Sequence, residues 1–207
     1  MLDKKVIILG YSGHGFVVTE TALNAHIDVA YYSELEALEN NPFNLEYIGF
    51  EVDTNFKGWN SDCDFILGIG DNTIRKRVAK QVLSKQKNLL NVIDTSAFIS
   101  KTATLGTGNF IGKHSTINAL ASIGDFCILN TGSIIEHECS LGDAVHVAPG
   151  AVLLGNVSVG ENTFIGANTV VKQNIKIGKN VIIGAGSVII KDIPDNVKVV
   201  GNPGRII

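Results

Sequence analysis

The stretch LLGNVS-VGENTF-IGANTV-VKQNIK-IGKNVI-IGAGSV, residues 153 to 188, consists of six-residue units that each begin with leucine, valine or isoleucine. The same spacing holds without interruption from Ile93 to Ile189. A period of six matches neither an α-helix nor a free hairpin strand, but it suits a chain wound into a prism whose flat faces are short parallel strands. Three units make one triangular coil, so the run predicts about five coils stacked about 4.8 Å apart.

The other positions of the repeat are typical of tight corners. The residue four places after each aliphatic is mostly small or β-branched, as at Ala97, Ser115 and Thr163, and the residue directly after the aliphatic is often glycine. This pattern resembles the hexapeptide repeat of the hexapeptide acyltransferases. The resemblance implies a left-handed parallel β-helix over residues 91–207.

Residues 1–90 lack the repeat and predict an α/β unit instead. Residues 6–9 form a buried strand, the glycine-rich turn GYSGHG occupies residues 10–15, and residues 16–25 have helical spacing. A second strand is expected at residues 29–32, a third at 65–69, and a basic amphipathic helix at 74–83. This succession predicts a Rossmann-like domain with a ligand crevice at the carboxyl ends of its strands, where Ser12, Ser33 and Asp71 fall.

Composition excludes several classes of function. A formal charge of −3 and a pI near 5.9 give no electrostatic footprint for nucleic acid. No apolar run approaches the roughly eighteen residues that a bilayer span needs, and the N-terminus leads into a strand without a cleavable signal, so we expect a cytoplasmic protein with no membrane partner. Three cysteines without CxxC spacing predict buried thiols rather than a redox or metal site.

The glycine-rich turn leaves two interpretations open. Gly10, Gly13 and Gly15 suit a helix N-terminus whose free N–H groups face a phosphate, but a purely structural strand-to-helix turn has the same composition. The spacing is not GxGxxG, so a dinucleotide is not indicated. His14 favours the binding interpretation, because an imidazole in the turn can donate to a phosphate or a sugar hydroxyl. We therefore expect a nucleoside diphosphate-sugar.

Two histidines of the repeat region carry different expectations. His137 and His146 are nine residues apart, which is half a coil, so they should lie on different sides of the prism and share no metal ion. A three-histidine zinc site is disfavoured by the same arithmetic, and no metal is expected. His137 is flanked by Glu136 and Glu138, and a carboxylate that binds one ring nitrogen leaves the other as a base.

Several motifs together resemble the nucleotide-4-amino-sugar N-acetyltransferases, in particular those of the bacillosamine pathway. They are NTGSIIEHEC at residues 130–139, Gly155-Asn156, the turn GYSGHG, GIGDN at residues 68–72, and VGNP at residues 200–203. The resemblance covers nearly the whole chain. It implies acetyl-CoA-dependent acetylation of the 4-amino group of a nucleotide-linked sugar, most simply a UDP-4-amino-4,6-dideoxy-sugar, for bacterial glycan synthesis.

The resemblance also implies a role for individual residues. His137 would be the general base, Glu138 would orient it, and the Gly155 N–H would stabilise the developing oxyanion. His146 would contact the thioester or the pantetheine arm, and Ala167 and Ala185 would lie along acetyl-CoA. The implied nucleotide-sugar site consists of Ser12, Gly13, His14, Ser33, Glu34, Gly70, Asp71 and Asn72. Ser33-Glu34 stand where the family often has paired aspartates that read the base, so UDP is favoured but dTDP and GDP stay open.

The flat faces of a β-helix need covering, and packing of three prisms side by side covers them, so we expect a homotrimer with active sites between subunits. Two alternatives remain. A sialic acid O-acetyltransferase would use the same histidine on a hydroxyl and would need no nucleotide at the GYSGHG turn. A non-enzymatic sugar-nucleotide-binding scaffold should have lost the His-Glu pair, which is present here as His137 and Glu138.

Overall fold

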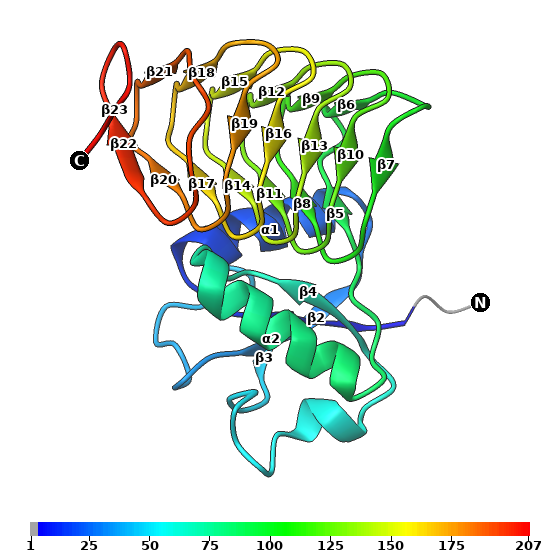
Figure 1. Cartoon of the computed structure of the whole chain (residues 1–207). Coiled ribbons are helices and arrows are strands. Elements are labelled where there is room, and N and C mark those ends of the chain that lie inside the picture. Colours follow the sequence, from blue (N-terminus) through cyan, green and yellow to red (C-terminus); the bar gives the residue numbers. More distant parts are fainter. Residues whose placement is uncertain (1–3) are drawn as a thin grey trace.

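The structure, a computed structural model, describes residues 4–207. They form a small α/β unit that lies beneath a triangular prism of two-residue strands (Figure 1). The α/β unit comes first in the chain and packs against one face of the prism, with helix α1 directly under it. The expected fold class, a Rossmann-like unit followed by a left-handed parallel β-helix, is confirmed.

The α/β unit is a parallel four-stranded sheet in the order β3-β2-β1-β4. Its strands are β1 (Val6–Leu9), β2 (Val29–Ser33), β3 (Glu46–Tyr47) and β4 (Asp64–Leu67), and its helices are α1 (Gly13–Asn24), the 3₁₀ helix η1 (Lys57–Asn60) and α2 (Asn72–Ser84). Strand β1 is buried at every residue because both faces of the sheet are covered. β3 and η1 were not expected, since neither has a periodic pattern.

Two expected boundaries are wrong. The glycine-rich segment is not a turn up to Gly15, because α1 already begins at Gly13 and the N–H of Phe16 donates to the Ser12 carbonyl at 2.8 Å. Glycine at position 15 lets the first helical turn lie against β1, since a Cβ there would collide with the Gly10 carbonyl. The third strand ends at Leu67, two residues early, where the chain turns toward α2.

The prism has three faces, which we name by their outer surfaces. The covered face, against the α/β unit, consists of β5 (Val92–Ile93), β8 (Phe110–Ile111), β11 (Ile128–Leu129), β14 (His146–Val147), β17 (Phe164–Ile165), β20 (Ile182–Ile183), β22 (Lys198–Val200) and β23 (Arg205–Ile206). The apolar face consists of β6 (Phe98–Ile99), β9 (Thr116–Ile117), β12 (Ile134–Ile135), β15 (Val152–Leu153), β18 (Val170–Val171) and β21 (Val188–Ile189). The polar face consists of β7 (Thr104–Leu105), β10 (Ser122–Ile123), β13 (Ser140–Leu141), β16 (Ser158–Val159) and β19 (Lys176–Ile177).

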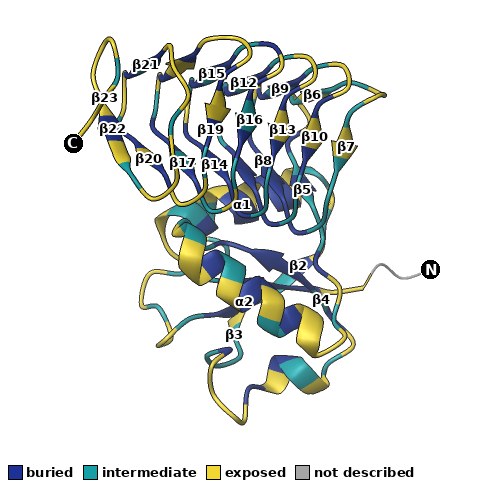
Figure 2. Ribbon diagram, viewed as in Figure 1, coloured by how far each residue is buried: buried dark blue, intermediate teal, exposed yellow. Residues whose placement is uncertain are grey.

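Each strand from β5 to β21 follows one rule, which explains the period of six. Its second residue is the repeat aliphatic and points into the core, as Leu129, Val147 and Ile165 do, and its first residue points outward. Parallel strands pair in register with the strand eighteen residues later, as Leu129 does with Val147. Figure 2 shows the outcome: the buried segments run continuously through the prism, and the polar face is exposed along β7, β10 and β13.

The two units share one apolar core at the covered face. Phe110 and Ile128 point out of the prism and pack with Tyr11 and Val18 of the α/β unit. Burial of these side chains fixes the position of α1 against the prism. All three cysteines are buried, as predicted, and burial raises the pKa of the Cys127 thiol to about 12. Over residues 4–207, helices are too short or too polar to cross a membrane.

Candidate functional site

His137 and Glu138 lie at the corner between the apolar and polar faces, which we call the His137 corner. His137 Nδ1 is 3.1 Å from Glu138 Oε2, and the two side chains are 59% and 57% exposed. In the tautomer with the proton on Nδ1, the ring donates to Glu138 and keeps a lone pair on Nε2. The corner therefore presents an accessible nitrogen base beside a carboxylate.

Gly155 lies one coil further along the same corner, directly against the His137 ring. A Cβ built on Gly155 would be 2.5 Å from His137 Nε2, so only glycine leaves room for the imidazole in this position. The N–H of Asn156 donates to the His137 carbonyl at 2.8 Å, whereas the N–H of Gly155 meets no acceptor within the described chain. The cavity of about 480 Å³ at this corner is also lined by Leu154 and Asn174.

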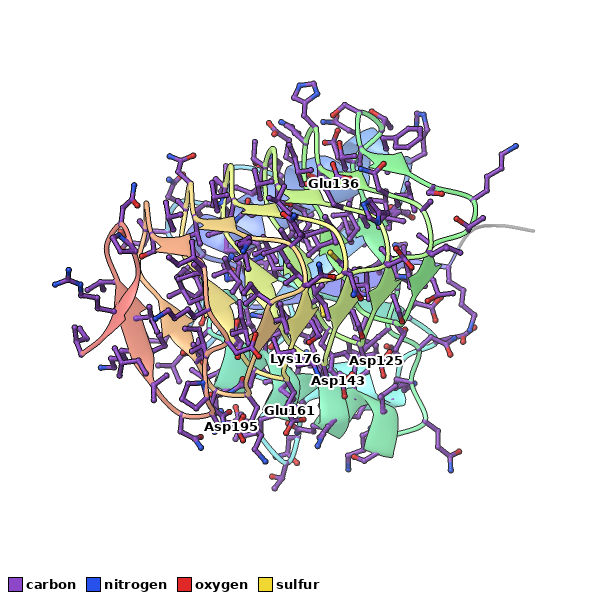
Figure 3. All side chains as sticks on the ribbon, turned by 45° about the horizontal axis from the view of Figure 1, so that its top comes forward. Asp125, Glu136, Asp143, Glu161, Lys176 and Asp195 are labelled. Atoms are coloured by element: carbon purple, nitrogen blue, oxygen red, sulfur yellow. The ribbon has the colours of Figure 1, made fainter. Side chains whose placement is uncertain are left out.

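His146 lies on the covered face, which is the face opposite the His137 corner. Figure 3 shows that Glu136, next to His137, lies on the far side of the prism from Asp125, Asp143 and Glu161 beside α2. The prediction from the half-coil spacing is confirmed. Ala167 and Ala185 stack at a third corner, between the covered and apolar faces, and so do not meet His137 within one chain.

His14 and His146 face each other between α1 and the covered face. Their ring centroids are 6.4 Å apart, with Phe110 edge-on to His14 and Phe164 edge-on to His146. Burial, together with the positive charge of Arg75, lowers the pKa of His14 to about 4 and that of His146 to about 3. Both rings are therefore neutral at pH 7. The buried ring nitrogens His14 Nε2 and His146 Nδ1 make no hydrogen bond of normal geometry. The Gly70 carbonyl near His146 opposes the lowering of the His146 pKa.

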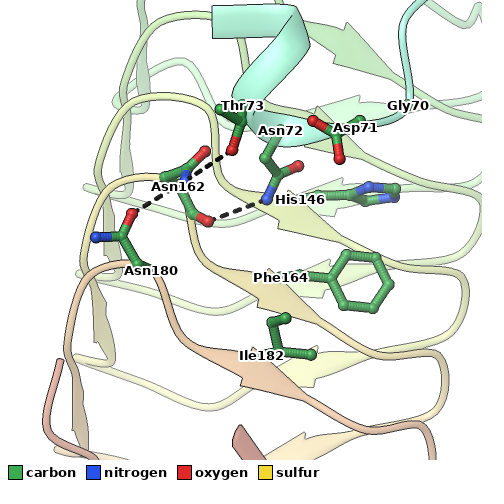
Figure 4. Close-up of a pocket in the computed structure, with 9 residues that line it drawn as sticks. All are labelled: Gly70, Asp71, Asn72, Thr73, His146, Asn162, Phe164, Asn180 and Ile182. Carbon is green, nitrogen blue, oxygen red and sulfur yellow. Dashed lines mark hydrogen bonds between the residues drawn. The ribbon is translucent and has the colours of Figure 1, made fainter. Parts of the chain in front are cut away.

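A cavity of about 440 Å³ separates the start of α2 from the covered face (Figure 4). Its lining residues are Gly70, Asp71, Asn72, Thr73, His146, Asn162, Phe164, Asn180 and Ile182. Asp71 is the N-cap of α2 and accepts from the Ile74 N–H at 2.8 Å, so its carboxylate is partly committed to the helix. Asn72 Nδ2 donates to the Asn162 carbonyl at 3.2 Å, which ties this loop to the prism.

A second cavity, of about 370 Å³, lies at the carboxyl ends of β1, β2 and β4, where the crevice was expected. It is lined by Gly10, Ser12, Ser33, Glu34, Leu35, Phe50, Glu51, Gly68, Ile69, Gly70, Ile74 and Arg77. Ser33 Oγ donates to Glu51 Oε2 at 2.6 Å, and Glu34 Oε2 accepts from the Tyr11 N–H at 3.0 Å. Gly70 lines both cavities, so the crevice and the His146 cavity are adjacent.

The residues of the GYSGHG segment lie in two different places. Ser12 and Gly13 are exposed at the N-terminus of α1, and a Cβ on Gly13 would meet no atom within 4 Å. The space in front of this helix terminus is therefore open to a ligand. The His14 ring instead lies between α1 and the covered face, with its centroid 6.4 Å from that of His146.

Two residues of the site were missed from the sequence. Glu51 is buried beside Ser33 in a segment without periodicity, so no pattern pointed to it. Arg75 is 1% exposed, although it lies in the basic run IRKR. A signal was present, because Arg75 shares its helical face with the buried residues Val78, Ala79 and Val82.

Comparisons with known proteins match both units of the chain. The family described as PglD N-terminal domain matches residues 5–82, and the family described as bacterial transferase hexapeptide (six repeats) matches residues 156–191. The chain is 36% identical over 115 residues to a UDP-N-acetylbacillosamine N-acetyltransferase from Bacillus subtilis (strain 168). That match covers 52% of this chain and 51% of the relative, so it spans about half of the relative's length.

Solved structures match over nearly the full length. Perosamine N-acetyltransferase from Caulobacter crescentus, a histidine-to-asparagine mutant in complex with CoA and GDP-perosamine, is 31% identical with a TM-score of 0.92, covering 98% of this chain and 96% of that one. The acetyltransferase domain of PglB from Neisseria gonorrhoeae, in complex with acetyl coenzyme A, is 29% identical with a TM-score of 0.89 and covers 99% of this chain and 100% of that domain.

Proposed function

This chain belongs to the family of nucleotide-amino-sugar N-acetyltransferases, and we propose that it transfers the acetyl group of acetyl-CoA to the 4-amino group of a nucleotide-linked sugar for bacterial glycan synthesis. The observation that carries the proposal is the imidazole of His137, held against Gly155 with Glu138 at 3.1 Å. This arrangement combines a base and a free N–H donor at one point, as transfer of an acyl group to an amine requires.

His137 acts as the general base. Its Nε2 takes a proton from the amine as the nitrogen attacks the thioester carbonyl, a role that typically contributes about 10²–10⁴-fold to the rate. Glu138 holds the proton of Nδ1 and stabilises the imidazolium that forms. The Gly155 N–H donates to the carbonyl oxygen as it gains negative charge. The C–S bond then breaks, and the thiol of CoA leaves with the proton.

The α/β unit holds the nucleotide-sugar. The N-terminus of α1, at Ser12 and Gly13, offers unpaired N–H groups and the positive end of the helix dipole to the diphosphate. Ser33 and Glu34 lie beyond it at the end of β2 and face the nucleoside. Gly70, Asp71 and Asn72 continue the site toward the prism. Uridine is the proposed nucleoside. The relatives' names include both UDP- and GDP-linked sugars, so guanosine is tested beside it, together with thymidine.

The proposed active site needs two copies of the chain. His137 and the nucleotide crevice lie on opposite sides of one prism, so the base of one protomer meets the nucleotide-sugar held by its neighbour. The apolar face supports this assembly. Five of its six outward residues are apolar, namely Phe98, Ile134, Val152, Val170 and Val188, and the sixth is Thr116, whereas those of the polar face are mainly serine. A homotrimer packs such faces around one axis.

The proposal divides the work between two units. Residues 1–90 bind the nucleotide-sugar, and residues 91–207 carry the acetyl transfer. His146, Ala167 and Ala185 contact acetyl-CoA from the covered face and the third corner, opposite the partner that supplies His137. No step requires a metal ion. The proposed location of the reaction is the cytoplasm.

An acetyl-transfer assay tests the function directly. Purified protein is incubated with acetyl-CoA and one acceptor at a time: UDP-, dTDP- and GDP-4-amino-4,6-dideoxy-sugars, the matching 4-hydroxy sugars, and free sialic acid. We expect release of the CoA thiol with at least one nucleotide-4-amino-sugar. We expect no release with any of the 4-hydroxy sugars. Transfer to free sialic acid alone would instead identify an O-acetyltransferase, and no transfer to any acceptor would overturn the proposed reaction.

A further inference from the structure

Arg75, on the first turn of α2, has an unusual environment for a charged side chain. It is 1% exposed, and its five hydrogen bonds all go to uncharged oxygens. Nε donates to the carbonyl of Phe126 at 2.8 Å, Nη1 donates to the carbonyls of Ile69 (3.2 Å) and Gly70 (2.9 Å), and Nη2 donates to Asn72 Oδ1 (2.9 Å) and the carbonyl of Ala144 (3.0 Å).

The charge of Arg75 is not neutralised by an ion pair. Among residues 4–207, carboxylates form salt bridges with Lys4, Lys76, Lys113 and His137, and Arg75 has none. Burial lowers the pKa of the guanidinium to about 10, with Cys127 and Asp71 opposing the shift, so the group is still a cation at pH 7. Burying an unpaired cation is costly, and here only the five hydrogen bonds offset that cost.

These hydrogen bonds join two parts of the molecule. Phe126 and Ala144 are corner residues of consecutive coils of the prism, and both have left-handed backbone conformations (φ 58° and 56°). Ile69, Gly70 and Asn72 belong to the loop that links β4 to α2 and lines the ligand cavities. One planar side chain thus binds two successive coils through Nε and Nη2, and binds residues 69–72 through Nη1 and Nη2. A lysine has a single nitrogen and cannot reproduce this geometry.

We propose that Arg75 is a positioning residue for acetyl transfer. It holds residues 69–72 against the prism and thereby fixes the nucleotide-sugar relative to the His137 corner of the neighbouring protomer. The inference rests on the proposed function and adds to it a residue that touches neither substrate. The same cation lies near His14 and His146 and disfavours their protonation.

Two substitutions separate geometry from charge. Arg75→Lys retains the cation and loses the planar fork, whereas Arg75→Met loses both. A displacement of about 1 Å in a reacting group lowers rates by about 10²-fold, so we expect kcat for the nucleotide-sugar to fall by about that factor in both variants. The Kd of acetyl-CoA should change less than twofold.

Lys76→Met is the matched control. Lys76 is on the same turn of α2 and pairs with Glu161 across the same junction, but that ion pair is partly exposed and is expected to contribute little. Hydrogen exchange of the full-length protein provides a second readout that needs no substrate. In Arg75→Lys, amides of residues 69–75 should exchange at least tenfold faster, while those of β11, β14 and β17 keep wild-type protection. Lys76→Met should leave both readouts near wild type.

Two outcomes would overturn the proposal. Wild-type kcat and loop protection in Arg75→Lys would show that the hydrogen bonds have no positioning role. Equal loss of protection in loop and prism, with loss of acetyl-CoA binding, would show that Arg75 only maintains the fold. Absence of transfer by the wild-type protein would instead count against the proposed function, and the exchange experiment would still decide whether Arg75 holds the loop.

Discussion

The His137 corner and the His146 cavity use the same side chain in opposite ways. His137 is more than half exposed and has Glu138 at 3.1 Å, whereas His146 is 9% exposed, near a buried cation, with its pKa lowered to about 3. A histidine that must gain and lose a proton needs access to solvent and a carboxylate partner. A histidine held neutral provides shape and a hydrogen bond. The comparison therefore supports the proposed roles, in which His137 transfers the proton and His146 contacts a ligand.

Removing the exposed histidine should have the largest effect. His137→Ala is expected to lower kcat by about 10²-fold or more with little change in the Kd of acetyl-CoA, because it removes the proton acceptor alone. Steady-state kinetics and titration calorimetry measure the two quantities. His114→Ala is the control, since His114 is an exposed corner histidine of the same prism. Near-normal turnover in His137→Ala would exclude it as the base.

Crowding the base should have the next largest effect. In Gly155→Ala, the new Cβ would lie 2.5 Å from His137 Nε2, so the ring must rotate away from the Gly155 N–H. We expect kcat to fall by about 10- to 100-fold without loss of the trimer. Gly132→Asn is the control, because Gly132 has φ 65°, a conformation that asparagine accepts, and open space around it. Equal kcat values for Gly155→Ala and Gly132→Asn would show that Gly155 has no role in acetyl transfer.

Blocking the helix terminus should weaken nucleotide binding alone. No protein atom lies within 4 Å of a Cβ at Gly13, so Gly13→Val projects into open space in front of α1. The Kd of the nucleoside diphosphate, measured by calorimetry, should rise at least tenfold, whereas that of acetyl-CoA should be unchanged. Gly13→Ala should give a smaller rise. Wild-type nucleotide affinity in Gly13→Val would place the diphosphate elsewhere.

The buried histidines should affect stability more subtly. Their pKa values lie below the unfolded value near 6.5, so below that pH the unfolded state binds more protons and stability falls as pH is lowered toward 4. Each group contributes a loss on the order of 1 kcal/mol between pH 6.5 and 5.5. Urea unfolding of wild type and His146→Gln measures this, and the variant should show a shallower dependence. Identical slopes would mean that His146 protonates normally in the fold.

The prism was predictable because its repeat is written directly in the sequence. Each coil repeats the same core position, so an unbroken run of aliphatics from Ile93 to Ile189 defines both the strands and the corners. The placement of His137 and Gly155 at one corner follows from their separation by one coil of eighteen residues. The outward residues that distinguish the apolar face from the polar face obey the same register.

The junction between the two units was not predictable from local patterns. Arg75 was expected only as part of a basic amphipathic helix. Its helical face indicates burial, but its acceptors in the prism are backbone carbonyls of Phe126 and Ala144, which the sequence does not reveal. The orientation of His14 toward His146 likewise depends on how α1 packs against the prism. Glu51 becomes part of the crevice only through its contact with Ser33.

The central claim is that each active site combines His137 of one copy with the nucleotide crevice of another. Co-expression of His137→Ala and Gly13→Val chains tests it, since each parent alone should be nearly inactive. In a trimer that contains both chains, one of the three sites pairs an intact base with an intact crevice, so purified mixed trimers should regain about a third of wild-type kcat. Activity no greater than the sum of the two parents, in trimers shown to contain both chains, would contradict the account.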